Sequence, residues 1–178
     1  MHLLLVRAER PEDGPAIAAV NRRAFGREDE ARIVAAVRAS DGFIPELSMV
    51  AERDGTVVGH AMFSRATICD GDQHWRVLVL GPVAVLPELQ RQGIGSAMIQ
   101  EGLAAARAAS HRVVVLLGHP TYYPRFGFEP SARHGIQQPF KVGDASMALF
   151  LDPAARGTVR GVVVWPPAFG VGSAGIVS

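Results

Sequence analysis

The chain has few of the residues that disulfides, metal sites and membrane spans require. Its 178 residues include a single cysteine, Cys69, so no internal disulfide can form. No cysteine pair indicates a zinc site, and this usage is typical of a reducing cytoplasm. The longest mostly apolar run, Val77–Pro87, contains a glycine and a proline and is much shorter than the roughly 20 residues that cross a bilayer. We therefore expect no metal and no membrane span.

The first apolar stretch, Leu3–Val6, is too short for the apolar segment of a secretory signal, which favours a cytoplasmic location. The chain also lacks a surplus of one charge, because 18 Lys and Arg stand against 17 Asp and Glu. Such a balance leaves little positive charge for nucleic-acid phosphates, so we expect no nucleic-acid partner. With 48% hydrophobic residues, the length suits one domain with a full-sized core.

The first 40 residues predict one strand and two helices. Leu3–Ala8 has the composition of a strand and is followed by an acidic turn that begins with proline, which suits the start of a helix. Ile17, Val20 and Phe25 should face the core from that helix. A second helical pattern runs from Glu28 to Ala39, with apolar residues three and four apart.

A hairpin and a bent strand follow. Ser48–Arg53 and Thr56–Thr67 flank Asp54-Gly55, a dipeptide that favours two-residue hairpin turns because both positions take positive φ. Trp75–Leu86 is another strand pattern. Gly81-Pro82 interrupts it, and proline inside a strand removes a ladder donor, so we expect a bulge or bend there.

The next segments predict a βαβ unit. Gly93–Ala109 carries a helical apolar stripe, and Val113–Leu117 is the continuous β-branched run of a strand buried on both faces. This strand should lie parallel to Trp75–Leu86. A short helix at Thr121–Phe126 and strands near Phe128 and Met147–Leu151 complete a mixed sheet. The tail from residue 157 has no clear pattern.

The turn before the third helix carries the clearest motif, Gln90-Arg91-Gln92-Gly93-Ile94-Gly95-Ser96. Helix N-termini hold phosphates, and glycines let the backbone approach a ligand closely. Two glycines before a helix can equally be structural. The segment is not a Walker A loop, because no Gly-Lys-Ser/Thr ends it, and Met98 stands where a dinucleotide fingerprint has its third glycine.

Gln90–Gly95 resembles the Gln/Arg-x-x-Gly-x-Gly/Ala signature of the GNAT superfamily of acetyl-CoA-dependent N-acyltransferases. Tyr123 to Phe128 is similar to the family's Tyr-x-x-x-Gly-Phe segment, and the order of elements agrees from about Leu3 to Leu151. The tail with Pro166-Pro167-Ala168-Phe169 resembles an uncharacterised bacterial subgroup. The resemblance implies a GNAT-like single domain over residues 1–178, with a core at about 3–151 and a C-terminal extension at 152–178.

The implied fold is a mixed α/β (α+β) one, with a central, mostly antiparallel sheet, one splayed parallel strand pair and helices on both faces. The resemblance also implies that acetyl-CoA is the co-substrate. Its pantetheine would pair with the backbone of the bulged strand, and its pyrophosphate would meet the N–H groups of the turn. These cofactor-binding residues are Val83, Ala84, Val85, Arg91, Gln92, Gly93, Ile94, Gly95, Ser96 and Tyr123.

Transfer to an amine requires a proton acceptor for the amine and a donor for the departing thiolate. Tyr123 matches the family position whose hydroxyl points at the thioester sulfur, although a packing role for this ring is the alternative. His119 follows a central strand at its carboxyl end, where ligands bind in open sheets, and is one candidate base. Glu46 is a second candidate that could orient a cationic amine. Both could also be solvated surface residues.

The resulting hypothesis is an N-acetyltransferase that moves the acetyl group directly to a small-molecule or peptide amine. The loops around Phe43–Leu47 and Phe140–Met147 should set the identity of the acceptor. Homodimerisation stays open. Two alternatives remain, an acyl-CoA-binding sensor without turnover and a regulatory protein-binding module.

Overall fold

The computed structural model describes residues 3–170 and forms two compact units. Of the described residues, unit 1 comprises 3–64 and 81–106, and unit 2 comprises 65–80 and 107–170. Residues 1–2 and 171–178, the last of which belong to the expected C-terminal extension, lie outside the described part. The helices are α1 (Gly14–Phe25), α2 (Asp29–Arg38) and α3 (Ile94–Ala108). The strands are β1 (Leu4–Ala8), β2 (Ser48–Arg53), β3 (Thr56–Asp70), β4 (Gln73–Val85), β5 (Val113–Leu117), β6 (Glu129–Pro130), β7 (Ile136–Gln137), β8 (Ser146–Phe150) and β9 (Gly161–Val164).

The sheet of unit 1 is antiparallel at its start. β1 pairs with β2 and β2 with β3, and the turn between β2 and β3 has positive φ at both Asp54 (49°) and Gly55 (80°). Those values are the ones a two-residue hairpin of the Asp-Gly type requires. The predicted hairpin is therefore confirmed, with β3 running three residues beyond the expected end at Thr67.

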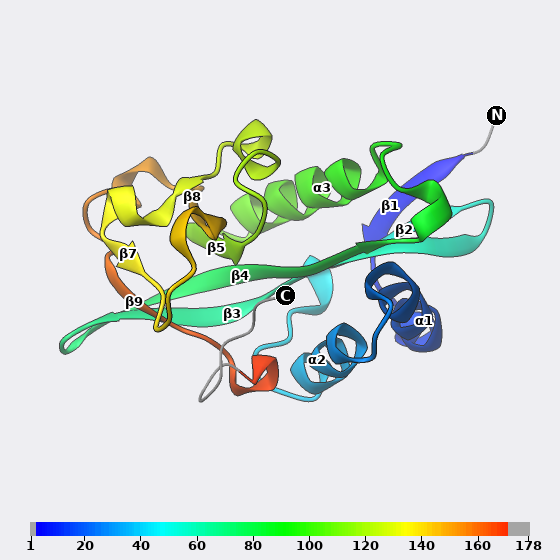
Figure 1. Cartoon of the computed structure of the whole chain (residues 1–178), viewed down its shortest axis with the longest axis horizontal. Coiled ribbons are helices and arrows are strands. Elements are labelled where there is room, and N and C mark those ends of the chain that lie inside the picture. Colours follow the sequence, from blue (N-terminus) through cyan, green and yellow to red (C-terminus); the bar gives the residue numbers. More distant parts are fainter. Residues whose placement is uncertain (1–2, 171–178) are drawn as a thin grey trace. The chain divides into compact units, whose positions relative to one another are not determined.

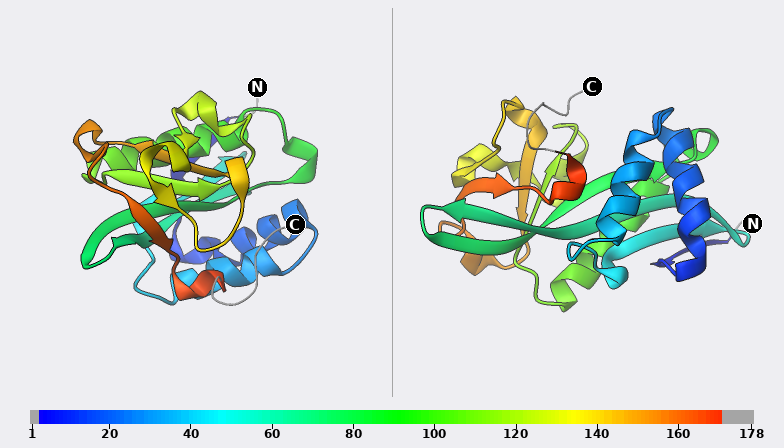
Figure 2. Two further views of the ribbon diagram at one scale, coloured as in Figure 1. Left: turned by 60° about the vertical axis from the view of Figure 1, so that its left-hand side comes forward. Right: turned by 90° about the horizontal axis from the view of Figure 1, so that it is seen from below.

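Alternation along β2 and β3 divides the side chains of unit 1 between two faces. Met49, Ala51 and Ala61 form one buried cluster with Ile94 and Met98 of α3. Successive residues of a strand point to opposite faces, so the neighbours of these residues point toward α1 and α2. Figure 1 shows α3 on one side of these strands and α1 and α2 on the other, and Figure 2 shows the latter pair side by side.

The helices of unit 1 bury most of their predicted faces. Ile17 and Val20 of α1 and Val34 and Val37 of α2 are at most 2% exposed. The prediction that Phe25 faces the core is wrong, because its side chain is 39% exposed. Phe25 is the last residue of α1, and the chain leaves the helix at Gly26 in a left-handed conformation, where little of the core remains to cover the ring.

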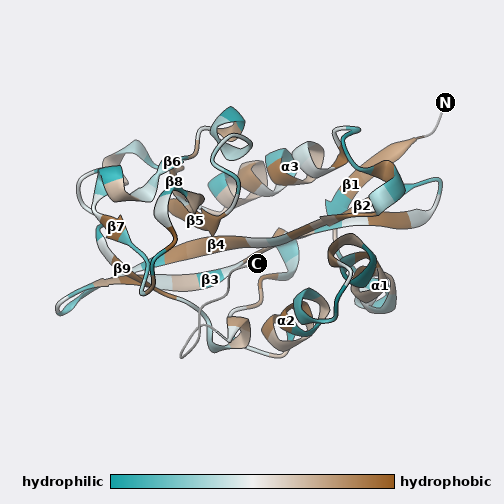
Figure 3. Ribbon diagram, viewed as in Figure 1, coloured by the Kyte–Doolittle hydropathy of each residue, from teal (hydrophilic) through white to brown (hydrophobic). Residues whose placement is uncertain are grey.

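Unit 2 contains the parallel strand pair. Leu78 and Val79 of β4 pair with Val114 and Val115 of β5, and β5 also pairs antiparallel with β8. The first four residues of β5 are completely buried, as a strand covered on both faces should be. Figure 3 shows this concentration of hydrophobic residues on β4 and β5.

The remaining predictions for unit 2 hold with smaller differences. The short helix expected at Thr121–Phe126 is a 3-10 turn at Tyr123–Phe126, and the expected strands near Phe128 and Met147 are β6 and β8. The unassigned tail contributes β9, which pairs with β3 and β7. Within residues 3–170 no helix is long and apolar enough to cross a membrane. The expected single domain over residues 1–178 stays a prediction.

Candidate active site

The turn into α3, in unit 1, has the backbone that a phosphate-binding segment needs. Arg91 and Gly93 both take left-handed conformations, with φ of 60° and 83°, and α3 begins at Ile94. The first intrahelical bond runs from the Ala97 amide to the Gly93 carbonyl (2.9 Å), so the amides of Ile94 and Gly95 lie in the first turn, where N–H groups have no acceptor within the helix. A Cβ built on Gly93 would meet no atom within 4 Å, so open space adjoins the turn there.

Side chains of the same segment brace this turn. Gln90 donates from Nε2 to the Val85 carbonyl (3.1 Å), and Gln92 donates to the Glu88 carbonyl (3.3 Å). Both Nη atoms of Arg53 lie 3.4 Å from the Gln92 Oε1, and the Arg53 Nε is buried without a hydrogen-bond partner among residues 3–170. Arg91 is exposed and forms no hydrogen bond or ion pair in that part of the chain. Two guanidinium groups are thus associated with the turn, and sequence reasoning had found only Arg91.

The bulge predicted in β4 coincides with a backbone irregularity. Gly81 has φ of 151°, the Gly81–Pro82 peptide bond is cis, and the pairs of β4 with β5 at Leu78 and Val79 precede it. Beyond the irregularity, Val83 and Val85 are half-buried and Ala84 is buried. The Val85 carbonyl accepts the hydrogen bond from Gln90, which leaves its second lone pair for another donor.

Tyr123, in unit 2, lies against the end of β5. Its ring occupies the space beside Gly118, where a Cβ would collide with it, and its edge contacts Phe128 at a centroid distance of 5.8 Å. Burial and the neighbouring Tyr122 raise the pKa of the Tyr123 hydroxyl to about 12. The hydroxyl therefore keeps its proton throughout the neutral range.

The structure distinguishes Tyr122 from its neighbour. The Arg125 guanidinium lies over the Tyr122 ring, 4.3 Å from its centroid, and its Nε donates to the Tyr122 carbonyl at 2.8 Å. Tyr122 is thus engaged in a local cation–π contact, whereas Tyr123 packs toward the strand end. The role of Tyr123 as the general acid stays a prediction.

The two candidate bases lie in different surroundings. His119 is exposed directly after Gly118, and its carbonyl accepts from the amides of Tyr122 (3.1 Å) and Tyr123 (3.5 Å), so the backbone turn brings it close to Tyr123. Glu46 lies in unit 1, exposed in the 3-10 turn Pro45–Leu47 before β2. Neither side chain forms a hydrogen bond or ion pair within residues 3–170, so both are available to a substrate.

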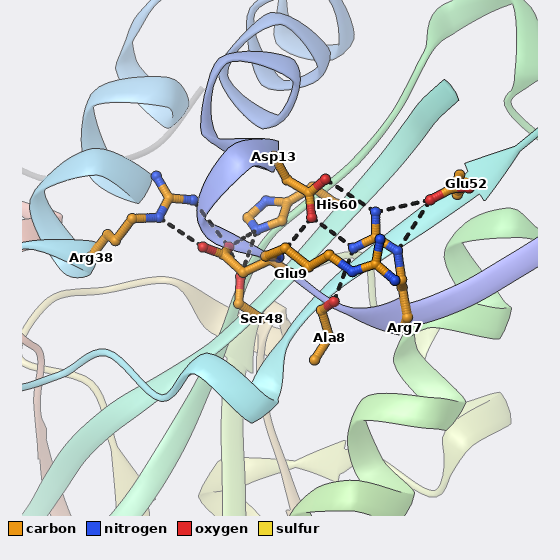
Figure 4. Close-up of polar contacts among 9 residues, drawn as sticks. Arg7, Ala8, Glu9, Asp13, Arg38, Ser48, Glu52 and His60 are labelled. Atoms are coloured by element: carbon orange, nitrogen blue, oxygen red, sulfur yellow. Dashed lines mark hydrogen bonds and ion pairs between the residues drawn. The ribbon is translucent and has the colours of Figure 1, made fainter. Parts of the chain in front are cut away.

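A buried polar network in unit 1 was not found from the sequence. Glu9, just after β1, contacts Arg38, Ser48 and His60, as Figure 4 shows. The side chain of Glu9 is 5% exposed and that of His60 is completely buried. The one available signal was His60 itself, a histidine inside an otherwise apolar strand pattern.

A cavity in unit 2 is lined by the chain neighbours of His119 and Tyr123 and by Asp144 and Met147 of the predicted acceptor loop. It is open, has a volume of about 600 Å³, and its walls include Pro120, Pro124, Glu129 and Arg156. Glu129 accepts hydrogen bonds from both His134 (3.0 Å) and Arg156 (2.8 Å), so this carboxylate of the cavity wall is already paired. None of the predicted site residues lines this cavity.

Comparisons with known proteins connect these features to a family. Residues 6–131 match the model of the acetyltransferase (GNAT) domain. The chain is 37% identical over 140 residues to the uncharacterised N-acetyltransferase YjhQ of Escherichia coli, which covers 78% of this chain and 77% of that protein.

Two solved structures agree with this assignment. The crystal structure of YhbS, a GNAT family N-acetyltransferase from Escherichia coli in complex with CoA, superimposes with a TM-score of 0.86 at 30% identity, covering 94% of this chain and 92% of that one. A GNAT family acetyltransferase from Brucella melitensis in complex with acetyl-CoA gives a TM-score of 0.78 at 37% identity, over 95% and 99% of the two chains. The mixed α/β fold, with its β4–β5 parallel pair, is accordingly the GNAT fold, and the chain belongs to the GNAT family of N-acetyltransferases.

Proposed function

We propose that the chain binds acetyl-CoA and transfers its acetyl group directly to a primary amine of a small molecule or a peptide. The observation that carries the proposal is the turn into α3, where a left-handed glycine, a helix N-terminus and an exposed arginine coincide. Together they supply amide donors and positive charge to phosphate. The relatives YhbS and the Brucella enzyme, which were crystallised with CoA and acetyl-CoA, support the same ligand.

Two segments would hold the co-substrate. The amides of residues 91–96 and the Arg91 guanidinium would bind the pyrophosphate, with Arg53 adding charge. The backbone of Val83–Val85 would pair with the pantetheine amides, since strand backbone beyond the last β4–β5 pairs offers both donors and acceptors. When bound, acetyl-CoA supplies an acetyl group on a thioester, which an amine nitrogen can attack.

Tyr123 would assist the departure of the thiolate. Moving a proton from a phenol of pKa about 12 to a thiolate whose ordinary pKa is about 8.5 is uphill by about 5 kcal/mol. The Tyr123 hydroxyl therefore acts chiefly as a hydrogen-bond donor to the sulfur while the carbon–sulfur bond breaks. Solvent completes the protonation of the free thiol.

The amine must lose one proton as its nitrogen–carbon bond forms. His119 is the proposed acceptor, directly or through a water, because it is exposed and its backbone adjoins Tyr123. Glu46 is the alternative base, and as an exposed carboxylate it can attract a cationic amine whichever residue takes the proton. A cytoplasmic location remains part of the proposal.

The experiment measures acetyl-CoA binding by calorimetry and thiol release with a panel of amines. Gly93→Val should weaken binding by at least about 100-fold, because the side chain enters open space beside the turn and strains a left-handed residue. Gly26→Val is the matched control. Gly26 also has positive φ (68°) and open space around a Cβ, but it ends α1, so this variant should lose similar stability and keep its affinity.

Wild-type affinity in Gly93→Val would refute this binding site. Binding without thiol release from any amine would instead identify an acyl-CoA sensor.

A further inference from the structure

The loop formed by residues 39–47 joins α2 to β2, and its two ends meet on one carboxylate. Arg38, the last residue of α2, donates from Nε to Glu9 Oε1 (2.8 Å) and from Nη2 to Glu9 Oε2 (3.0 Å). Ser48, the first residue of β2, donates its hydroxyl to the same Oε2. Glu9 is therefore a single anchor for both ends of the 39–47 loop, as Figure 4 shows.

The Glu9 carboxylate is ionised despite its burial. Burial alone would raise its pKa, but the hydrogen bonds with His60, Arg38 and Ser48 outweigh that effect and hold the pKa at about 2. A charge-assisted hydrogen bond is about twice as strong as a neutral one. The anchor thus stays intact across the pH range in which an enzyme of this family could work.

His60 also belongs to this network, and the hydrogen bonds of its neighbours determine which of its ring nitrogens carries the proton. Since the Ser48 proton goes to Glu9, His60 Nε2 must be the donor in its 3.0 Å contact with Ser48 Oγ. His60 Nδ1 then accepts from Asn21 Nδ2 (3.2 Å), whose orientation is fixed because Nδ2 also donates to the Ile17 carbonyl. Burial lowers the pKa of His60, which agrees with this neutral tautomer.

This serine, histidine and glutamate cannot act as a nucleophilic triad. Ser48 and His60 are both completely buried, so no substrate reaches them. The carboxylate also approaches Nε2, the nitrogen that contacts the serine, instead of the opposite ring nitrogen as a triad requires. The network can therefore affect the reaction only through the 39–47 loop that it positions.

The 39–47 loop includes Phe43–Leu47, around which the sequence predicts a loop that sets the identity of the acceptor. Ile44 and Leu47 anchor the loop in the core, at 7% and 1% exposure, while Glu46 points to solvent. Phe43 is half-buried, and the Arg38 guanidinium lies over its ring at 5.9 Å from the centroid. Arg38 therefore couples Glu9 to Phe43 as well as to the end of α2.

We propose that Glu9 is a positioning residue for the acceptor, because its buried carboxylate fixes both ends of the 39–47 loop and so presents Glu46 and Phe43 to a cationic amine. The inference rests on the proposed function. Glu9 does not touch the substrate. Glu46 supplies the charge that attracts the ammonium group, and the edge of the Phe43 ring supplies apolar surface to its carbon chain.

The test compares Ser48→Ala and Glu9→Gln with Ser64→Ala. Ser64 is a matched control because it is equally buried on β3, but its hydroxyl has no hydrogen-bond partner among residues 3–170. Amide hydrogen exchange in residues 39–47, acetyl-CoA affinity and the kinetics with an amine from the panel are measured for each variant. Should Glu9→Gln fail to fold, Ser48→Ala alone decides, since it leaves the Glu9–Arg38 pair in place.

We expect exchange in the 39–47 loop to accelerate by about 10-fold or more in both variants, as loss of a hydrogen bond to a charged group should produce. The KM for the amine should rise by a similar factor, with kcat and acetyl-CoA affinity within about twofold. Ser64→Ala should change none of these quantities.

Two results would overturn the proposal, and they can be told apart. Unchanged exchange and unchanged KM in Ser48→Ala, with normal wild-type turnover, would refute the role of Glu9 alone. A wild-type chain that acetylates no amine would refute the proposed function and with it the acceptor role, whatever the exchange pattern.

Discussion

Two loops, one in each unit, end in the same way but are held by different chemistry. In unit 1 the 39–47 loop finishes with a 3-10 turn, and Ser48 begins β2. In unit 2 residues 139–145 also finish with a 3-10 turn, and Ser146 begins β8. Ser48 donates to an ionised Glu9, whereas Ser146 accepts from Gln138 Nε2 (3.0 Å) and lies 2.5 Å from the Ser131 hydroxyl.

The uncharged network extends from Ser146 and Gln138 to Trp165. Trp165, which follows β9, donates from Nε1 to Gln138 Oε1 at 2.7 Å. This hydrogen bond holds Gln138, the residue directly before the 139–145 loop. A neutral hydrogen bond contributes roughly 1 kcal/mol, and breaking it leaves no charge behind. A buried ion pair leaves an uncompensated charge when one partner is lost. The hydrogen bonds that hold the 39–47 loop thus depend on charge and pH, whereas those of Ser146 and Gln138 beside the 139–145 loop do not.

The largest effect should come from removing the charged anchor. Glu9→Ala leaves the Arg38 guanidinium without its partner and Ser48 and His60 with an unfilled polar site. Losing one partner of a buried pair costs about 3 to 5 kcal/mol, and the lower figure applies because the Arg38 side chain is 29% exposed. Urea unfolding measures the loss, with Gln138→Ala as the uncharged counterpart at about 1 kcal/mol. Equal losses in the two variants would remove the distinction between the loops.

Much of the fold follows from local patterns in the sequence. The Asp54-Gly55 turn, the apolar stripe of α3 and the β-branched run of β5 each depend on residues close together in the chain, and each was predicted correctly. Phe25 was misplaced because a helical pattern does not show where the core ends. β9 was missed because its partners, β3 and β7, are distant in sequence.

The candidate site was predictable only where it is local. Residues 90–96 form one turn, so the pattern of glycines predicted where the turn lies, and its phosphate-binding role stays a prediction. The Glu9 network joins residues of α2, β2 and β3 to a glutamate that follows β1, and a glutamate at a strand end looks like any solvated carboxylate. Arg53 was missed for a similar reason, because only the folded position of Gln92 shows that this hairpin arginine lies beside the turn.

The neighbouring tyrosines Tyr122 and Tyr123 allow acetyl-CoA binding to be separated from the chemical step. We expect Tyr123→Phe to lower turnover by about 100-fold or less, with acetyl-CoA affinity unchanged, because it removes a donor to the leaving sulfur and keeps the ring that fills the space beside Gly118. Tyr122→Phe keeps the ring under Arg125 and should leave turnover near the wild-type value. Steady-state kinetics with calorimetry checks both variants. A silent Tyr123→Phe beside a damaged Tyr122→Phe would reverse the assignment.

Acid should destabilise the Glu9 network of unit 1 before it affects the uncharged hydrogen bonds of Ser146 and Gln138 in unit 2. Burial lowers the pKa of His60 in the folded chain, so below about 6.5 the unfolded chain takes up a proton that the folded chain refuses. Stability from this group is therefore present above pH 6.5 and falls with pH below it, by at most about 1.4 kcal/mol per pH unit. The charged groups facing His60 are Glu9, which opposes the shift, and Arg38, which adds to it.

Glu9 adds a second loss at lower pH. Its pKa of about 2 lies below the ordinary 4.5, so its contribution is present above pH 4.5 and disappears as the pH falls toward 2. His60→Gln should flatten the first loss, measured as the free energy of unfolding between pH 7 and 5. His111, whose pKa burial and Arg65 also lower, contributes to the same range, and His111→Gln removes that part separately. An unchanged slope in His60→Gln would show that His60 does not remain neutral in the folded chain.

The smallest expected effect is the difference in the free energy of unfolding between Ser48→Ala and Ser146→Ala. This difference isolates the contribution of charge. Ser48 and Ser146 are both buried, both begin a strand after a 3-10 turn, and both lose the same single oxygen on mutation to alanine. Ser48→Ala breaks a hydrogen bond to a carboxylate and should cost about 2 kcal/mol, whereas Ser146→Ala breaks neutral hydrogen bonds and should cost about 1 kcal/mol. Denaturant unfolding of the two variants beside Ser64→Ala, which removes a hydroxyl without a partner among residues 3–170, measures the difference. The gap should narrow as the pH falls from about 4.5 toward 2, the pKa of Glu9 in the folded chain, because a protonated carboxyl group accepts a weaker hydrogen bond. A gap that is independent of pH would mean that packing around the two serines, and not the charge on Glu9, sets the cost.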